Sequence, residues 1–271
     1  MSFEIRPIRL HIKCAMSSKI FKGNVSRYNS ITVILEKQDA EFDLHNFREI
    51  LEASKNEWVS KSYVACWLQI SKNLAKYVPI AIESGYDFHH AKPGFVMLTQ
   101  WFLSTPNNLP TYANHFIGVA GLVVLDDKVL AIRERYARDE SSSPNPLWKL
   151  PGGLADTEEF IPDVAKREVY EETGIKCEFQ SLLTFRHLLN FRFGCSDIYF
   201  VCIMKPLTSE IDASLVEVAE CRWIPVDEFD NYKKSKLAHS IWLKYRNHCR
   251  ENTSCINNTK ITENDMLFFV E

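Results

Sequence analysis

The fold and the candidate site of this chain follow from one stretch, GLADTEEFIPDVAKREVYEETGI, which spans Gly153–Ile175. On a helix, Glu168, Glu171 and Glu172 lie at positions i, i+3 and i+4, so these carboxylates share one face. Gly174 favours a helix end, which places the acids in the last turn and a half. There each like-charge pair costs about 0.2–0.5 kcal/mol, and the helix dipole adds roughly 0.3–1 kcal/mol. A compensating cation would resolve this conflict, so we predict a cup for a divalent metal.

Length and charge limit the classes of partner. The chain has 271 residues, enough for one large domain or two modest ones with a sizeable core. Its net charge of −3 provides no electrostatic attraction for nucleic acid or for membranes as bulk partners. No apolar run reaches the length of a membrane span. Length and charge therefore disfavour a membrane or a nucleic acid as the bulk partner.

The cysteines and the first residues bear on the compartment. The 8 cysteines are spread thinly and form no CxxC pair, which favours reduced thiols in an intracellular compartment. The first thirty residues carry six basic side chains against one acid, Glu4. This pattern is typical either of a mitochondrial presequence or of a basic N-terminal strand. Cytoplasm, mitochondrion and nucleus all stay open.

The first half of the chain predicts a compact α/β unit with the element order β-α-β-α-β-β. Asp43 is the expected cap of a helix whose apolar positions follow a 3.6-residue period from Leu44 to Trp58. Pro79 divides the next helical segment, 72–83, into two short pieces. The expected strands are Ile31–Leu35, Tyr63–Ile70, Tyr86–His90 and Phe95–Leu103.

The second half predicts another α/β unit after a proline- and asparagine-rich linker, STPNNLPTYANH. A hairpin turns at Asp126-Asp127, and the acidic helix follows Pro151-Gly152-Gly153. Later strands are expected at Lys176–Phe185, Ser196–Met204 and Cys221–Ile224, with helices from Val226 and over Ala238–Arg250. The predicted division is a segment 1–27, which is the possible targeting sequence, a domain 28–104, a linker 105–115, a domain 116–250 and a C-terminal tail 251–271. The tail is expected to be polar and loose over 251–260, whereas Met266–Val270 could dock.

The central stretch also matches a longer pattern, Gly-x5-Glu-x7-Arg-Glu-U-x-Glu-Glu-x-Gly-U, where U is aliphatic. The matching residues are Gly153, Glu159, Arg167, Glu168, Val169, Glu171, Glu172, Gly174 and Ile175. At average composition, such a match is expected at about one in a billion starting positions. This pattern is the Nudix box, and the chain strongly resembles a Nudix hydrolase.

Further similarity lies outside the box, at Phe88–Ala91, Leu109–His115 and Val119–Gly121. These segments resemble the subgroup that carries an extra pre-Nudix domain. The subgroup includes the protein encoded antisense to basic fibroblast growth factor, and its plant relatives. The resemblance implies an α/β fold class: a C-terminal α/β/α sandwich with a mixed sheet, preceded by a smaller, acetyltransferase-like α/β domain.

The resemblance also implies a reaction and a metal site. Family members hydrolyse a nucleoside diphosphate linked to another moiety by attack of water on phosphorus. Mg²⁺, or alternatively Mn²⁺, neutralises the pyrophosphate and prefers oxygen ligands. The implied ligands are Glu168, Glu171, Glu172 and a main-chain carbonyl at Gly152 or Gly153. Similarity to the plant relatives suggests ADP-ribose or an NADH-like dinucleotide as the substrate.

The remaining catalytic roles leave alternatives open. The resemblance implies that Arg167 pairs with Glu159 and supports the helix, whereas a surface pair would contribute under about 1 kcal/mol. For the general base we place Glu217 first, because a family glutamate lies before a tryptophan, with Glu220 and Glu168 as competitors.

Several aromatic and basic residues are candidates for substrate contact. Trp148 could stack on a base, or it could be a buried core aromatic. Arg192 and Phe193 could hold a nucleotide by phosphate contact and stacking, or they could belong to an ordinary hairpin turn. His89 and His90 are better explained by strand packing than by metal ligation.

Two other classes of function compete with the hydrolase. One is a regulatory protein with a Nudix fold and negligible turnover, which the complete set of acids and glycines disfavours. The other is an RNA-cap-directed enzyme, which the mildly acidic chain disfavours. We also predict a homodimer supported by the N-terminal domain, because its apolar strands exceed the needs of so small a unit.

Overall fold

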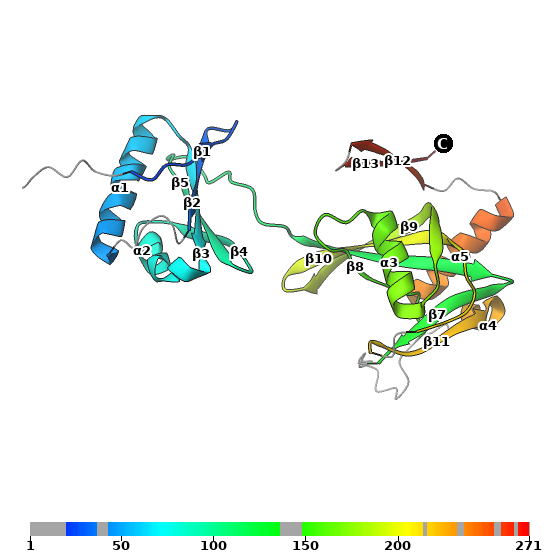
Figure 1. Cartoon of the computed structure of the whole chain (residues 1–271). Helices are drawn as coiled ribbons and strands as arrows, with labels where there is room; N and C mark the ends of the chain where they lie inside the picture. Colours follow the sequence, from blue (N-terminus) through cyan, green and yellow to red (C-terminus); the bar gives the residue numbers. More distant parts are fainter. Residues whose placement is uncertain are drawn as a thin grey trace, which may run out of the picture. The chain divides into compact units, whose positions relative to one another are not determined.

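The computed structural model describes residues 20–36, 43–135, 148–213, 216–231, 236–251, 256–262 and 265–270 (Figure 1). The chain divides into two compact units, Met1–Tyr112 and Ala113–Glu271. Each has its own sheet with helices, so the predicted class of two α/β domains is confirmed. The basic segment 1–19 and the loop 136–147 lie outside the described residues. No described helix is long and apolar enough to cross a membrane.

In the first unit, the described strands form a five-stranded sheet in the order β1-β2-β3-β5-β4. Strands β2 and β3 are parallel, and the other neighbours are antiparallel. Its elements are β1 Asn24–Val25, β2 Ser30–Leu35, α1 Leu44–Ser60, β3 Ala65–Ser71, the 3-10 helix η2 Lys72–Tyr77, α2 Val78–Glu83, β4 Asp87–Lys92 and β5 Phe95–Trp101.

One face of this sheet is covered by helices. Helix α1 begins where expected, because the Asp43 side chain accepts a hydrogen bond from the Asn46 N–H at 2.8 Å. Phe47 and Trp58 are buried against the sheet, whereas Leu44 is 51% exposed although the periodicity placed it on the apolar face. The break before Pro79 separates η2 from α2, which confirms the prediction of two short pieces.

In the second unit, eight described strands form a mixed sheet with the order β11-β7-β6-β10-β9-β12-β13, and β8 pairs with β6. Strand β10 runs parallel to β6, and the other pairings are antiparallel. The elements are β6 His115–Leu125, β7 Lys128–Glu134, β8 Gly152–Leu154, α3 Ile161–Thr173, β9 Cys177–Arg192, β10 Cys195–Pro206, β11 Val218–Pro225, α4 Val226–Asn231, α5 Lys236–Glu251, β12 Ile256–Thr262 and β13 Asp265–Val270.

Two apolar clusters lie on opposite faces of this sheet, which gives three layers (Figure 1). One contains Val164 and Val169 of α3, and the other contains Phe229 of α4 and Trp242 of α5. The β6–β7 hairpin turns at Asp126 and Asp127, whose φ angles of 47° and 57° suit a two-residue hairpin turn.

Two sequence expectations about this sheet are wrong. The tail was expected to be loose over 251–260, but Ile256–Thr262 is strand β12, which pairs with β13 and, at Ile256, with Leu182 of β9. Its isoleucines and threonines favour a strand despite the intervening asparagines. Strand β9 also continues to Arg192 instead of ending at Phe185, because β10 pairs with it along that length.

Candidate active site

Helix α3 holds the acidic residues against the centre of the second sheet. Val164, Ala165 and Val169 are fully buried in one apolar cluster with residues of β6 and β10. A Cβ at Gly121 of β6 would lie 2.4 Å from a Val169 methyl group, so glycine allows the helix and the strand to approach closely. The helix ends at Gly174, whose φ of 73° is left-handed and whose N–H donates to the Tyr170 carbonyl at 2.8 Å.

Gly152 and Gly153 bring the main chain against both β6 and the helix acids. A Cβ at Gly152 would lie 2.4 Å from the Val119 carbonyl oxygen and 2.6 Å from the Ala120 Cα. A Cβ at Gly153 would lie 2.5 Å from Glu168 Oε1. The absence of side chains at these positions therefore allows β8 to pair with β6 while a carboxylate rests on its other side.

We expect Gly152→Ala to destabilise the second unit by about 1–3 kcal/mol, because the added methyl group would overlap main-chain atoms that cannot rotate away. Urea denaturation monitored by tryptophan fluorescence measures this loss. Gly194→Asn is the matched control, since Gly194 has φ of 75° with open space around it, and asparagine tolerates that conformation. Equal stability of the two variants would contradict the close approach at Gly152.

Arg167 is the electrostatic centre of the site. Its guanidinium donates two hydrogen bonds to Glu159, at 2.8 and 2.7 Å. The same group donates to Glu168 at 2.8 Å, to Glu171 at 3.2 Å and to the Leu154 carbonyl at 3.2 Å. The bonds from Arg167 hold the pKa of Glu159 below its usual value, and these carboxylates raise the pKa of Arg167. The guanidinium thus ties the loop before α3 to the helix.

Glu168 and Glu172 are the shielded acids of the helix. Glu172 is 7% exposed, and its carboxylate accepts a hydrogen bond from the Gly152 N–H at 2.7 Å. Burial raises the pKa of Glu172 to about 7, although Lys149 and the Gly152 N–H favour the charged form. Burial also raises the pKa of Glu168, against the hydrogen bond from Arg167. These two acids therefore occupy positions where an additional cation would stabilise their charge.

Lys149 and Glu134 belong to this site, and the sequence reasoning missed both. The Lys149 ammonium pairs with Glu134 and lies 4.0 Å from Glu172 and 3.4 Å from the Gly152 carbonyl oxygen. Lys149 is placed there by main-chain hydrogen bonds to Ile132 of β7. Lys149 could have been predicted, because it is a cation only three residues before Gly152. Glu134 could not, because it has no fixed sequence spacing from the Nudix box.

The residues present have the chemistry that a divalent cation prefers, because Glu168, Glu171 and Glu172 supply carboxylate oxygens. Gly153 has no side chain, so its main chain also lies directly beside the Glu168 carboxylate. Within the described ranges, however, no three acidic, histidine or cysteine side chains are gathered closely enough to hold a metal ion. Arg167 bonds to Glu168 and Glu171, whereas Glu172 is directed to Gly152. The three-carboxylate cup stays a prediction.

The two candidate bases of the later loop differ in their surroundings. Glu217 is exposed just before β11, and its carbonyl accepts a hydrogen bond from the Arg135 N–H at 2.8 Å. Among the described residues, the Glu217 carboxylate makes no hydrogen bond or ion pair with helix α3. Glu220 pairs with both Arg133, at 3.1 Å, and Arg222. The Glu220 carboxylate therefore already forms ion pairs with two cations, whereas the Glu217 side chain is exposed to solvent.

The candidate substrate-contacting residues lie in two different settings. Trp148 is 3% exposed, and the Arg133 guanidinium lies 4.2 Å from its ring centroid, so the indole occupies the core as the alternative reading expected. Phe193 is 93% exposed at the turn between β9 and β10, and Arg192 lies beside it with its guanidinium over the Phe191 ring. Among the described contacts, none joins Trp148 to the turn that carries Arg192 and Phe193.

Comparison with known proteins gives independent information. Residues 21–102 match the model of the Nudix hydrolase domain, and residues 115–245 match that of the NUDIX domain. The chain is 37% identical to human nucleoside diphosphate-linked moiety X motif 6 over 236 residues, which cover 83% of this chain and 73% of that protein. It is 31% identical to Nudix hydrolase 7 of Arabidopsis thaliana over 224 residues, covering 79% and 75%.

A third relative is Nudix hydrolase 8 of Arabidopsis thaliana, 40% identical over 185 residues, or 68% of this chain. The match spans about half, 49%, of that longer protein. The two matched domains and the high coverage of the human relative establish the family. The chain belongs to the Nudix hydrolases, which are generally pyrophosphohydrolases, and it carries the additional N-terminal Nudix hydrolase domain.

Proposed function

We propose that the chain is a Mg²⁺-dependent pyrophosphohydrolase that cleaves the diphosphate of a nucleoside diphosphate linked to another moiety. Mn²⁺ is the alternative metal. The observation that carries this proposal is the arrangement at the end of α3, where the shielded carboxylates of Glu168 and Glu172 lie against the bare main chain of Gly152 and Gly153. Carboxylates in that setting are suited to a hard cation.

Each residue of the site then has a defined task. Glu168, Glu171, Glu172 and the Gly153 carbonyl would hold the metal, which when bound neutralises the diphosphate and lowers the pKa of water. Arg167 is a positioning residue, because it holds Glu159 and the Leu154 carbonyl and so fixes the helix against the preceding loop. Lys149 likewise orients Glu172 by its charge.

For the general base, Glu217 remains our first choice. Its carboxylate is exposed and unpaired within the described residues, so it is available to accept a proton from water. Glu220 is less suited because Arg133 and Arg222 stabilise its charged form. Glu168 stays the second candidate, since burial raises its pKa toward the operating range of a base.

We propose ADP-ribose or an NADH-like dinucleotide as the substrate, by similarity to the plant Nudix relatives. Arg192 and Phe193 are the stronger candidates for substrate contact, because Phe193 is almost fully exposed and Arg192 is exposed beside it. The Trp148 ring would have to leave the core, and Arg133 would have to move away, before a base could stack on it.

A substrate panel tests the proposal. The full chain is incubated with ADP-ribose, NADH, other nucleotide sugars and capped RNA, with Mg²⁺ or Mn²⁺, and released phosphate is measured after phosphatase coupling. We expect metal-dependent turnover of a small diphosphate-linked nucleotide. Turnover of capped RNA alone would assign the enzyme to RNA. Absence of turnover with every substrate would favour the regulatory alternative.

An intracellular site of action is also proposed. Among the described cysteines, Cys66, Cys177 and Cys202 are buried free thiols, and burial raises the pKa of Cys66 and of Cys202 to about 12. They pack as small apolar core residues, which suits a reducing compartment.

The homodimer prediction has a separate test. The described part of the first unit leaves large apolar side chains exposed outside its pocket, including Leu44 at 51%, Val59 at 48% and Phe88 at 68%. A second copy would bury such surface. We therefore expect analytical ultracentrifugation to give a species of about twice the chain mass of 31.4 kDa. A concentration-independent monomer would contradict the dimer.

A further inference from the structure

The sheet of the first unit has two different faces. One packs on α1, η2 and α2 through residues such as Val33 and Leu68, which are fully buried. Because side chains alternate along a strand, the opposite face carries Thr32 of β2, Trp67 of β3 and Trp101 of β5. Thr32 and Trp67 are direct neighbours in the parallel β2–β3 register. Two indoles thus stand on a face that no described helix of this unit covers.

The segment after β5 crosses this open face instead of leaving the unit. The Trp101 indole N–H donates to the Thr105 carbonyl at 3.0 Å. The Pro110 carbonyl lies 2.8 Å from His89 Nε2, within hydrogen-bond distance. Tyr112 stacks on the His90 ring at a centroid distance of 4.4 Å and an angle of 9°. These contacts give His89 and His90 a packing role and hold a stretch that the sequence predicted as linker.

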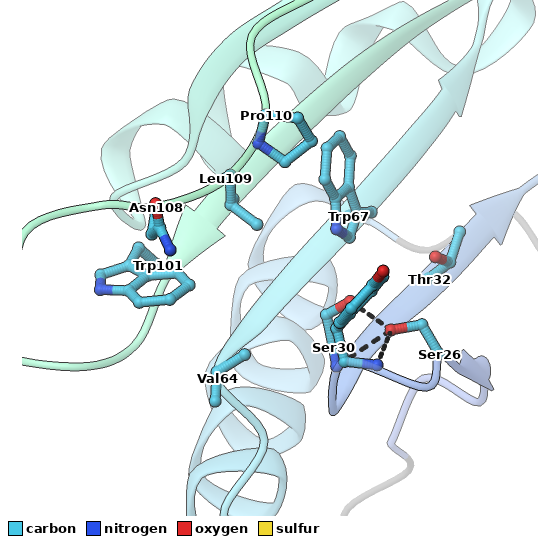
Figure 2. A pocket seen from close by; sticks show the side chains of 10 residues that line it. Ser26, Ser30, Thr32, Val64, Trp67, Trp101, Asn108, Leu109 and Pro110 are labelled. Carbon is cyan, nitrogen blue, oxygen red and sulfur yellow. Dashed lines mark hydrogen bonds between the residues drawn. The ribbon is translucent and has the colours of Figure 1, made fainter.

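The crossing segment and the sheet enclose a pocket of about 790 Å³ (Figure 2). Its volume lies within the range of small-molecule sites, roughly 300–1,000 Å³. One wall is the segment itself, through Asn108, Leu109 and Pro110. In Figure 2, Leu109 lies between the two indoles, Trp67 and Trp101.

The opposite wall of the pocket is polar but uncharged. It is formed by the hydroxyl side chains of Ser26, Ser30 and Thr32, together with the Tyr28 ring. Ser30 is only 6% exposed, and its hydroxyl is 2.8 Å from that of Ser26, which fixes both side chains (Figure 2). Arg27 does not line the pocket, but its guanidinium lies 4.7 Å from the centroid of the Tyr28 ring and donates a hydrogen bond to the Tyr28 hydroxyl at 2.6 Å.

This lining selects a class of ligand. Indole and phenol rings favour a flat or ring-shaped apolar surface, and hydroxyl and amide groups favour a ligand with its own donors and acceptors. No charged side chain lines the pocket among the described residues, so the lining itself offers a phosphate or carboxylate no counter-charge. The pocket therefore suits a neutral molecule that joins a planar ring to a hydroxylated portion.

We propose that this pocket of the first unit is a binding site for an uncharged nucleoside, with the base stacked on the indoles of Trp67 or Trp101 and the sugar toward the serine and threonine hydroxyls. The pocket and the α3 acids belong to different units, and the proposal does not depend on hydrolysis. Since Asn108–Pro110 forms one wall, the bound ligand would also hold the segment that precedes β6.

The test is an NMR titration of the ¹⁵N-labelled full chain with adenosine, using glucose as the non-aromatic probe. The 6 tryptophan indole signals, assigned by single Trp→Phe variants, give a residue-specific readout. We expect adenosine to shift the Trp67 and Trp101 signals and to leave Trp58, in the helix-covered core, unchanged. Glucose should shift none of them.

Two variants establish the location of binding. Thr32→Trp fills the pocket from β2, and Ile34→Trp is its matched control, two residues along the same strand face and outside the lining. Trp101→Ala removes one of the two indoles on which the base could stack. This variant tests the location of binding independently if Thr32→Trp fails to fold. We expect Thr32→Trp and Trp101→Ala each to weaken adenosine binding by about tenfold or more, and Ile34→Trp to leave it unchanged.

Three outcomes would overturn the proposal. The first is no shift of Trp67 or Trp101 with adenosine up to its solubility limit. The second is equal binding by wild type, Thr32→Trp and Trp101→Ala, which would place adenosine elsewhere on the chain. The third is a response to glucose without a response to adenosine, which would assign the pocket to sugars.

Discussion

Replacing Glu171 with glutamine is expected to lower Mg²⁺-stimulated turnover by about 100-fold or more, while the protein stays folded. The Glu171 side chain is 57% exposed, and its described polar contact is one hydrogen bond from Arg167 at 3.2 Å. An isosteric amide therefore removes charge without disturbing the core. If Glu171 is a metal ligand, the loss removes several kcal/mol of electrostatic stabilisation of the transition state. The measurement is kcat at increasing Mg²⁺ concentration with the best substrate of the panel.

The matched control for this variant is Glu178→Gln. Glu178 is an exposed glutamate near the start of β9, outside the box, so its loss should leave turnover unchanged. Glu172→Gln provides a second ligand variant, and circular dichroism verifies that each protein is folded. Wild-type turnover in both Glu171→Gln and Glu172→Gln would rule out the metal assignment.

Replacing Arg167 with alanine is expected to destabilise the second unit by about 2 kcal/mol and to lower turnover as well. The variant loses two hydrogen bonds to Glu159, and it leaves the acids around it without their cation. Glu159 and Glu168 have side chains only 17% and 13% exposed, so their charges are poorly solvated. Leaving such partly buried charges unpaired is costly. Urea denaturation gives the free energy of unfolding.

Two comparisons separate the role of Arg167 from a general charge effect. Arg167→Lys keeps the charge but cannot make the two-pronged bond to Glu159, so we expect only partial recovery of stability. Lys166→Ala removes a neighbouring exposed cation that pairs only with Asp163 in the described contacts, and it should cost under about 0.5 kcal/mol. Equal losses for Arg167→Ala and Lys166→Ala would contradict the positioning role.

Much of the fold could be predicted because its signals are local. The Asp43 cap, the break before Pro79 and the Asp126-Asp127 turn each depend on backbone preferences of a few neighbouring residues, and each is present in the structure. The helix α3 likewise ends at Gly174 as expected, where the chain turns left-handed. Such features do not require knowledge of distant parts of the chain.

Features set by distant partners could not be predicted in the same way. Strand β9 reaches Arg192 because β10 pairs with it, and polar tail residues form β12 because β13 and β9 offer partners. At the site, the sequence indicated three acids on one face but not that Arg167 would bond to two of them. Lys149 reaches Glu172 only because β7 holds it there.

The most direct test of the central proposal is hydrolysis of ADP-ribose by the full chain in ¹⁸O-labelled water, with and without Mg²⁺, followed by mass spectrometry of the products. We expect AMP and ribose 5-phosphate to form only when Mg²⁺ is present, with one solvent oxygen in the phosphate of one product. The same measurement with NADH extends the test to dinucleotides. No metal-dependent product from either compound, or products whose phosphate groups carry no solvent oxygen, would contradict water attack on the diphosphate at this site.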